Sequence, residues 1–120
     1  MSYRSFKNII ADFFGDFYSY QVVIFFEEAV QLAEKGDFTS TIKIGKDALA
    51  LTKFTKPGYE NLYLIGMLCQ AYLDNEQPKM ANKYFKRGMY MIDKNDEDYM
   101  DDVNAFLDLK ILINEELNKS

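Results

Sequence analysis

The stretch LIGMLCQAYLDNEQPKMANKYFKRGM, residues 64–89, decides the fold class of this chain. Its apolar residues recur every three or four positions on both sides of the central DNEQP, residues 74–78, which is the spacing of amphipathic helices. Pro78 suits the first turn of a helix, because a backbone N–H at that position has no partner within the helix. The stretch therefore predicts two helices, at about 60–74 and 78–92, joined by a short turn.

The same helical spacing continues on either side of this stretch. Further helices are predicted at about 3–14, 17–35, 37–52 and 97–117, and Pro57-Gly58 is the strongest turn signal between them. Gly15 is expected to separate the first two helices, with Asp16 as the N-cap of the second. Gly36 is a stop signal for that second helix, and Asp37 or Thr39 is expected to cap the next. The predicted fold is all-α.

The sequence resembles itself when a second copy is shifted so that position 36 aligns with position 76. We call this shift the repeat offset. Two copies of Gly-Asp-Phe, at 15–17 and 36–38, are separated by only one helix plus a turn, so they mark successive helix starts. At the repeat offset, small residues fall on small residues and lysines on lysines. The matched positions are Gly36-Asp37-Phe38 with Glu76-Gln77-Pro78, Ala29 with Cys69, Leu32 with Tyr72, Lys43 with Lys83, Lys46 with Lys86, Ala48 with Gly88, and Leu49 with Met89. This period predicts two helix pairs of about 40 residues each.

Residues 64–89 resemble a tetratricopeptide repeat (TPR). In that pattern a large apolar residue, a leucine followed by a small residue, and a tyrosine lie along the first helix, while an alanine, an aromatic and a small residue lie along the second. The matching residues are Ile65, Leu68, Cys69 and Tyr72, then Ala81, Phe85 and Gly88; Asp93 replaces the terminal proline. Residues 22–54 form a degenerate copy, in which Phe25, Ala29, Leu32, Gly36, Phe38 and Ala48 fit, whereas Glu28, Thr41 and Gly45 do not.

The resemblance implies one TPR-like domain over residues 1–120. Its expected parts are a capping helix at 1–16, a degenerate repeat at 17–54, a second repeat at 60–93 and a C-terminal capping helix at 97–117. A helix pair cannot bury its apolar face alone, and stacks usually need about three repeats. The two terminal helices are therefore expected to cover the ends of the stack, with self-association as the other route to closure.

Composition excludes several classes of partner. The chain has a formal net charge of −5, so it should repel nucleic acid and anionic membranes. It has no apolar run of membrane-spanning length, and its N-terminus lacks the features of a secretion signal. Cys69 is the single cysteine, which indicates a reducing compartment and a cytoplasmic location.

The sequence also argues against catalysis. It contains no histidine, the commonest general base and metal ligand at neutral pH, and no glycine-rich phosphate loop. Cys69 is expected in the core, where a helix crossing needs a small residue, rather than as a reactive thiol. The acidic run DKNDEDYMDD, residues 93–102, fails the calcium-loop pattern because Asp98 stands in place of the glycine and Asn104 in place of the glutamate. No enzyme activity, metal or cofactor is expected.

The TPR resemblance implies that partners bind to the inner face of the stack. The residues it places there are Val23, Phe26, Val30 and Ala33 from one helix and Tyr63, Gly66, Gln70 and Leu73 from the other. Chaperone-binding members of the family carry lysines and asparagines at this face to clamp a terminal carboxylate, and no such clamp is present here. The apolar face is either covered by a terminal helix or open to an apolar peptide or partner helix.

A basic stripe is predicted on the opposite, outer surface. Lys79, Lys83, Lys86 and Arg87 share one face of the helix predicted at 78–92, and Lys43 and Lys46 take equivalent places in the earlier pair. The stripe is interpreted either as a solvated face or as a docking surface for an acidic partner, including the chain's own acidic C-terminal segment.

The sequence supports three functional hypotheses. The leading one is a non-catalytic module that binds a protein or peptide through the apolar, tyrosine-lined inner groove. The second, from composition and repeat length, is a stand-alone sensor or antagonist similar to the peptide-pheromone sensors of Gram-positive regulatory systems. The third is a structural subunit that forms a homodimer or larger assembly through its Phe-rich N-terminal helix.

Overall fold

The computed structural model describes the backbone of residues 3–55 and 60–119, and the side chains of residues 17–55 and 62–119. The described helices are α1 (Tyr3–Glu34), α2 (Phe38–Leu51), α3 (Glu60–Asp74), α4 (Pro78–Met91) and α5 (Tyr99–Asn118), with a 3₁₀ turn at Thr52–Phe54. These ranges contain no strand, so the predicted all-α fold is confirmed. None of the helices, over the residues described, combines the length and apolarity needed to cross a membrane. The predicted turn at Pro57-Gly58 lies outside the described residues.

The predicted break at Gly15 is wrong, because α1 runs without interruption from Tyr3 to Glu34. A single glycine inside a helix costs only about 1 kcal/mol relative to alanine, and no proline stands nearby to remove a backbone hydrogen bond. Asp16 therefore lies within the helix and is not an N-cap. The predicted capping role of residues 1–16 depends on side chains that lie outside the described residues.

The two helix pairs, α1–α2 and α3–α4, are closed by the same turn at positions related by the repeat offset. Gly36 N–H donates to the carbonyl of Ala33 and Asp37 N–H to that of Leu32, and the matching residues Glu76 and Gln77 donate to Leu73 and Tyr72. This is the Schellman arrangement, in which the first residue beyond the helix takes a left-handed conformation. Gly36 has φ 81° and Glu76 has φ 61°. The predicted stop at Gly36 is confirmed.

The starts of the second helices also match. Asp37 is the N-cap of α2, and its carboxylate accepts a hydrogen bond from Ser40 N–H at 3.2 Å. Gln77 takes the same position before α4, where Pro78 is the first helical residue. Asp37 as a cap and Pro78 in a first helical turn were expected from the sequence, and the repeat offset relates the closing turn and the start of the second helix in the two pairs.

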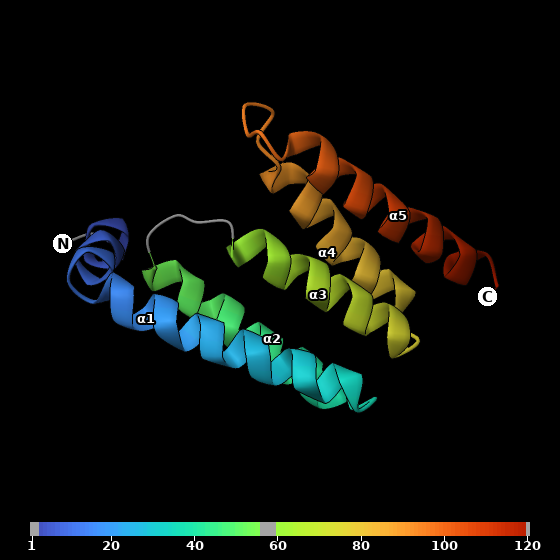
Figure 1. Ribbon diagram of the computed structural model, residues 1–120, viewed down its shortest axis with the longest axis horizontal. Coiled ribbons are helices and arrows are strands. Elements are labelled where there is room, and N and C mark those ends of the chain that lie inside the picture. The colour runs from blue at the N-terminus through green and yellow to red at the C-terminus, as the bar shows by residue number, and fades with distance from the viewer. Residues whose placement is uncertain (1–2, 56–59, 120) are drawn as a thin grey trace.

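The helices stack in chain order. Each packs mainly against its neighbour in the sequence, from α1 on α2 through to α4 on α5, and α3 also contacts both α1 and α5. Figure 1 shows this row of roughly aligned helices. The radius of gyration is 15.2 Å and the extents are 49 × 33 × 26 Å, against about 13.6 Å for a compact chain of this length. The molecule is therefore elongated along the stack.

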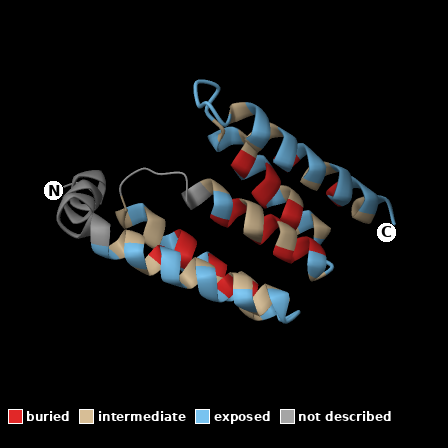
Figure 2. Ribbon diagram, in the orientation of Figure 1, coloured by how far each residue is buried: buried red, intermediate tan, exposed pale blue. Residues whose placement is uncertain are grey.

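The main core lies around α3. Figure 2 shows buried residues concentrated where α3 faces its neighbours. The principal cluster consists of Leu49 from α2, Ile65, Leu68, Cys69, Tyr72 and Leu73 from α3, Ala81, Tyr84 and Phe85 from α4, and Phe106 and Ile113 from α5. A smaller cluster of Val22, Ala48 and Leu64 joins α1 and α2 to α3. The central helix α3 thus contributes to both core clusters and connects the two pairs. The candidate site lies along the edge of α3 that remains exposed.

Candidate interaction groove

An apolar groove lies between α3 and α5, with a cavity of about 320 Å³. Its lining residues recur at helical spacing on one edge of each helix. They are Leu62, Tyr63, Gly66, Met67 and Gln70 from α3, and Asp102, Ala105, Phe106 and Leu109 from α5. We call this surface, together with the adjoining acidic pocket described below, the α3–α5 groove.

The groove exists because α5 is fixed to α4 more than to α3. The ring of Phe106 in α5 lies over Gly88 in α4, where a Cβ atom would stand only 2.6 Å from the ring's Cζ. Lys110 strengthens the same contact, because its ammonium lies 5.2 Å from the centre of the Phe85 ring and donates to Asn82 Oδ1 at 3.0 Å. With α5 held on α4, the absence of a side chain at Gly66 leaves space along the edge of α3.

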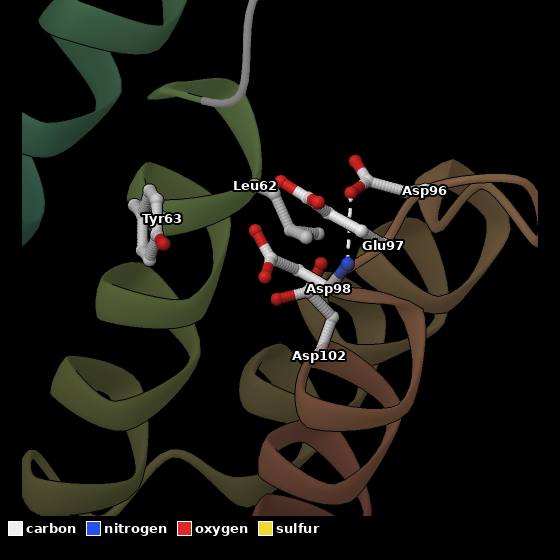
Figure 3. A pocket seen from close by; sticks show the side chains of 6 residues that line it. All are labelled: Leu62, Tyr63, Asp96, Glu97, Asp98 and Asp102. Carbon is white, nitrogen blue, oxygen red and sulfur yellow. Dashed lines mark hydrogen bonds between the residues drawn. The ribbon is translucent and has the colours of Figure 1, made fainter.

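The groove becomes acidic at the end where α5 begins. An adjoining pocket of about 380 Å³ shares Leu62, Tyr63 and Asp102 with the apolar part and adds Asp96, Glu97 and Asp98. Figure 3 shows these acidic side chains coming from the α4–α5 loop and the start of α5, on the side that faces Leu62. The backbone N–H of Asp98 donates to Asp96 Oδ1 at 3.0 Å, which holds the loop in a tight turn.

Charge is strongly concentrated at this end. Residues 93–102 contain six acids and one lysine, a formal charge of −5, which equals the net charge of the whole chain. Burial, together with the nearby carboxylates of Asp98, Asp96 and Asp101, raises the pKa of the Asp102 carboxyl above its ordinary value. Within the described part of the chain, no basic side chain forms an ion pair with the carboxylates that line this pocket. Among the described residues, the acidic end therefore carries negative charge that no ion pair compensates, beside an apolar surface.

The described acids and the cysteine are not arranged to hold a metal ion. No group of three or more such side chains has the necessary geometry within the described residues. The acidic run that the sequence analysis compared with a calcium loop is instead the loop between α4 and α5, with Asp98 as the N-cap of α5. Asp101 and Asp102 occupy the first turn of α5, where the helix dipole favours negative charge.

The structure separates the residues that the TPR resemblance placed on one inner face. Tyr63, Gly66 and Gln70 line the α3–α5 groove, whose other wall is α5 and not α1 as the resemblance implied. Leu73 instead is buried in the principal core cluster. On α1, Val23 is exposed, Val30 and Ala33 are half-buried, and Phe26 packs against the smaller core cluster. The predicted set is thus divided between the groove, the core and the surface of α1.

The predicted basic stripe lies at the surface. All six of its residues are exposed: Lys43 and Lys46 on α2, and Lys79, Lys83, Lys86 and Arg87 on α4. None of the six forms an ion pair with an acid among the residues that the structure describes. The stripe is therefore accessible.

Cys69 lies in the core, as expected. It is fully buried, and its Sγ donates to the carbonyl oxygen of Ala81 at 3.3 Å. Burial raises the pKa of the thiol to about 11, so almost none of it is thiolate at neutral pH. A thiol in this setting is a packing residue.

Sequence reasoning missed most of the residues that line the groove. It did not assign Met67, Phe106 or Leu109 to a surface, and it did not place the acids at 96–102 beside a groove. The concentration of charge was visible in the sequence, but its position beside an apolar groove depends on how α5 docks. A comparison of the chain with family models, with curated proteins and with solved structures finds no match.

Proposed function

We propose that this protein is a TPR-like interaction module that binds a segment of another protein, or a peptide, in the α3–α5 groove and performs no chemistry on it. The observation that carries this proposal is the open apolar cavity between two helix edges, with Tyr63 at its mouth. Tyrosine combines a large apolar surface with a hydrogen-bonding group, which makes it a frequent anchor at binding surfaces.

The TPR-like part of the proposal is supported by the recurrence of structure at the repeat offset. The same turn, the same cap position and the same length of the second helix are found in α1–α2 and α3–α4. Helical repeats of this kind commonly bind partners on the concave surface that the stacked pairs create. In this chain α3 is the first helix of the second pair, and α5 follows that pair as the next helix in the row.

The non-catalytic part is supported by the inventory of reactive groups. The sequence contains no histidine, and the single thiol is buried with a raised pKa. The groove offers carboxylates, a phenol, an amide and a thioether, a set that suits binding better than nucleophilic catalysis. The sensor-like and self-associating alternatives remain hypotheses; the N-terminal side chains on which self-association depends lie outside the described residues.

Site-specific photocrosslinking tests the proposal. A photoreactive phenylalanine analogue replaces Tyr63 in the groove or Tyr90 on α4, two tyrosines that are 57% and 93% exposed. On illumination in a lysate of the source cells, we expect distinct crosslinked products from position 63 and none of these from position 90. Introducing Gly66→Trp, which fills the groove beside Tyr63, should abolish the products.

Two results would contradict the proposal. One is the same set of products from positions 63 and 90, which would indicate nonspecific collisions. The other is a set of products at position 63 that persists with Gly66→Trp in a variant whose circular dichroism shows an intact fold.

A further inference from the structure

We infer that the occupant of the α3–α5 groove is a cationic peptide segment, in which a lysine or arginine lies next to a large apolar side chain. This inference rests on the proposed function and specifies the chemistry of its partner. The basic side chain would enter the acidic end, and the apolar side chain would fill the space above Gly66 and Ala105.

The first step of the argument is electrostatic. Outside residues 93–102 the chain holds equal numbers of acids and bases, thirteen of each, so this run carries a formal charge equal to the net charge of the chain. Four of its six acids line the groove. Asp102 already has a raised pKa because burial and three neighbouring carboxylates oppose its ionisation. A bound cation would relieve that opposition, whereas an anionic partner would increase it.

The second step concerns the kind of cation. The described acids do not form a metal site, so the geometry favours an organic cation carried on a side chain. Leu62 and Tyr63 line both parts of the groove. The aliphatic stem of a lysine or arginine can lie along such an apolar wall while its charged end reaches the carboxylates, and the Tyr63 ring adds a cation–π contact.

The third step links the two parts of the groove. They share Asp102 as well as Leu62 and Tyr63, so a ligand that reaches one part is already beside the other. The apolar part is walled by Met67, Phe106 and Leu109. Gln70 also lines it; its Nε2 donates to Asp74 Oδ1 at 3.0 Å, so its amide oxygen is the group that can accept from a peptide N–H. A basic residue and an apolar residue on neighbouring positions of one peptide therefore match the groove.

Selection from a displayed library of random dodecapeptides tests the inference with the intact chain as bait. We expect the selected peptides to be enriched in lysine or arginine next to leucine, isoleucine, methionine, phenylalanine or tryptophan. Synthetic copies should bind with an affinity that falls as salt rises, since part of the attraction is electrostatic.

Two charge-matched variants make the test specific. Asp98→Asn with Asp102→Asn removes two groove carboxylates, and Asp108→Asn with Glu115→Gln removes two exposed carboxylates of α5 that do not line the groove. We expect the first variant to weaken peptide binding by about tenfold or more and the second by less than about twofold. Circular dichroism checks that both remain folded.

The outcomes separate the inference from the proposed function. Peptides that lose binding with Gly66→Trp but show no excess of basic residues would overturn the inference and leave the groove proposal standing. The same holds if the two charge-matched variants bind equally. If no selected peptide responds to Gly66→Trp, both fail. A further result would also overturn the inference: the protein associates with itself in a salt-sensitive way, and Asp98→Asn with Asp102→Asn abolishes this association. That result would identify the basic stripe of a second copy as the occupant.

Discussion

The hydroxyl of Thr41 in α2 donates a hydrogen bond across the first helix pair to the carbonyl oxygen of Ala29 in α1, with 3.3 Å between the two oxygens. In the second pair, the thiol of Cys69 in α3 donates to the carbonyl oxygen of Ala81 in α4, also at 3.3 Å. At the repeat offset Ala29 corresponds to Cys69 and Thr41 to Ala81. Both pairs therefore have a side-chain hydrogen bond between their two helices at matching positions. The donor lies on the second helix in the first pair and on the first helix in the second pair. A small residue on the acceptor helix lets the two backbones come close enough for a short side chain to reach.

Replacing Thr41 by valine should lower the free energy of unfolding by about 1 kcal/mol, because it removes a buried hydrogen bond while keeping the side-chain shape. The Thr41 hydroxyl also approaches the carbonyl oxygen of Asp37 at 2.9 Å, so its single proton serves two acceptors. Urea denaturation followed by circular dichroism measures the change. Thr39→Val, at an exposed position of the same helix, is the control and should change stability by less than about 0.5 kcal/mol.

Replacing Glu76 by glycine should stabilise the protein by about 0.5–1 kcal/mol, because glycine adopts a left-handed conformation without the steric penalty of a Cβ atom. Glu76 has such a conformation, with φ 61°. The reciprocal change, Gly36→Ala at φ 81°, should destabilise the protein by about 1 kcal/mol. Thermal unfolding of both variants checks the pair. A lower melting temperature for Glu76→Gly would contradict this prediction. It would show that the Glu76 side chain stabilises the folded protein by more than the steric penalty of its Cβ atom.

Adding a methyl group at Gly88 should displace α5. The new Cβ would lie 2.6 Å from Phe106 Cζ, and overpacking of this kind costs about 1–3 kcal/mol. Gly66→Ala is the matched control, because a Cβ there would meet Phe106 Cζ at an ordinary 3.7 Å. It should gain up to about 1 kcal/mol from the higher helix propensity of alanine.

A double-mutant cycle between Gly88→Ala and Phe106→Leu tests whether the loss of stability in Gly88→Ala comes from the Phe106 ring. We expect the penalty of Gly88→Ala to shrink when Phe106 is replaced, because the smaller side chain leaves room for the methyl group. Additive effects in the cycle would mean that α4 and α5 do not meet at these two residues.

The stability of the protein should depend on the ionisation of Asp102 in acid solution. Its folded pKa is raised, by burial first and by Asp98, Asp96 and Asp101 next, from the ordinary value of 3.8. The folded state therefore binds the proton more tightly than the unfolded chain, and the contribution of this group to stability falls as pH rises from 3.8 through the folded pKa. NMR titration of the Asp102 carboxyl carbon measures its pKa directly. A pKa at or below 3.8 would contradict the prediction. Urea denaturation across the same pH range should show a flatter dependence for Asp102→Asn than for Asp108→Asn.

The thiol of Cys69 should be unreactive in the native protein. With a pKa of about 11 its thiolate fraction at neutral pH is on the order of 10⁻⁴, and the side chain is fully buried. A thiol-specific chromogenic reagent should react within seconds in concentrated guanidinium and only at the rate of unfolding in native buffer. The same shift predicts that stability falls as pH rises from 9.0 toward 11, since the unfolded thiol ionises first. Rapid reaction of the native protein would place Cys69 at the surface.

The local signals in the sequence predicted the helix ends well and the helix count poorly. Gly36, Asp37 and Pro78 act through backbone geometry and hydrogen bonds within a few residues, so their roles follow from the sequence alone. Gly15 carries the same kind of signal as Gly36 but lies inside α1. Glycine only weakens a helix, and the hydrogen bonds on either side of Gly15 are sufficient to continue it.

The residues of the groove show the opposite case. Tyr63 and Gln70 were placed on one edge of their helix by the TPR resemblance, and helical spacing does put them on the same edge of α3, although that edge faces α5 rather than α1. Phe106, Leu109 and Asp102 were not predicted at the groove, because their place beside α3 depends on contacts between residues far apart in the chain, such as Phe106 with Gly88 and Lys110 with Asn82.

By itself, the sequence determined an all-α chain with two helix pairs related by the repeat offset, an acidic run at 93–102 and a buried thiol. These properties depend on local backbone preference, hydrophobic spacing and composition. The tertiary structure alone decided that α5 docks on α4 rather than filling the edge of α3, and that the acidic run therefore borders an open apolar groove. The reason is steric: Gly88 has no side chain, so the Phe106 ring of α5 can lie against α4 at this point.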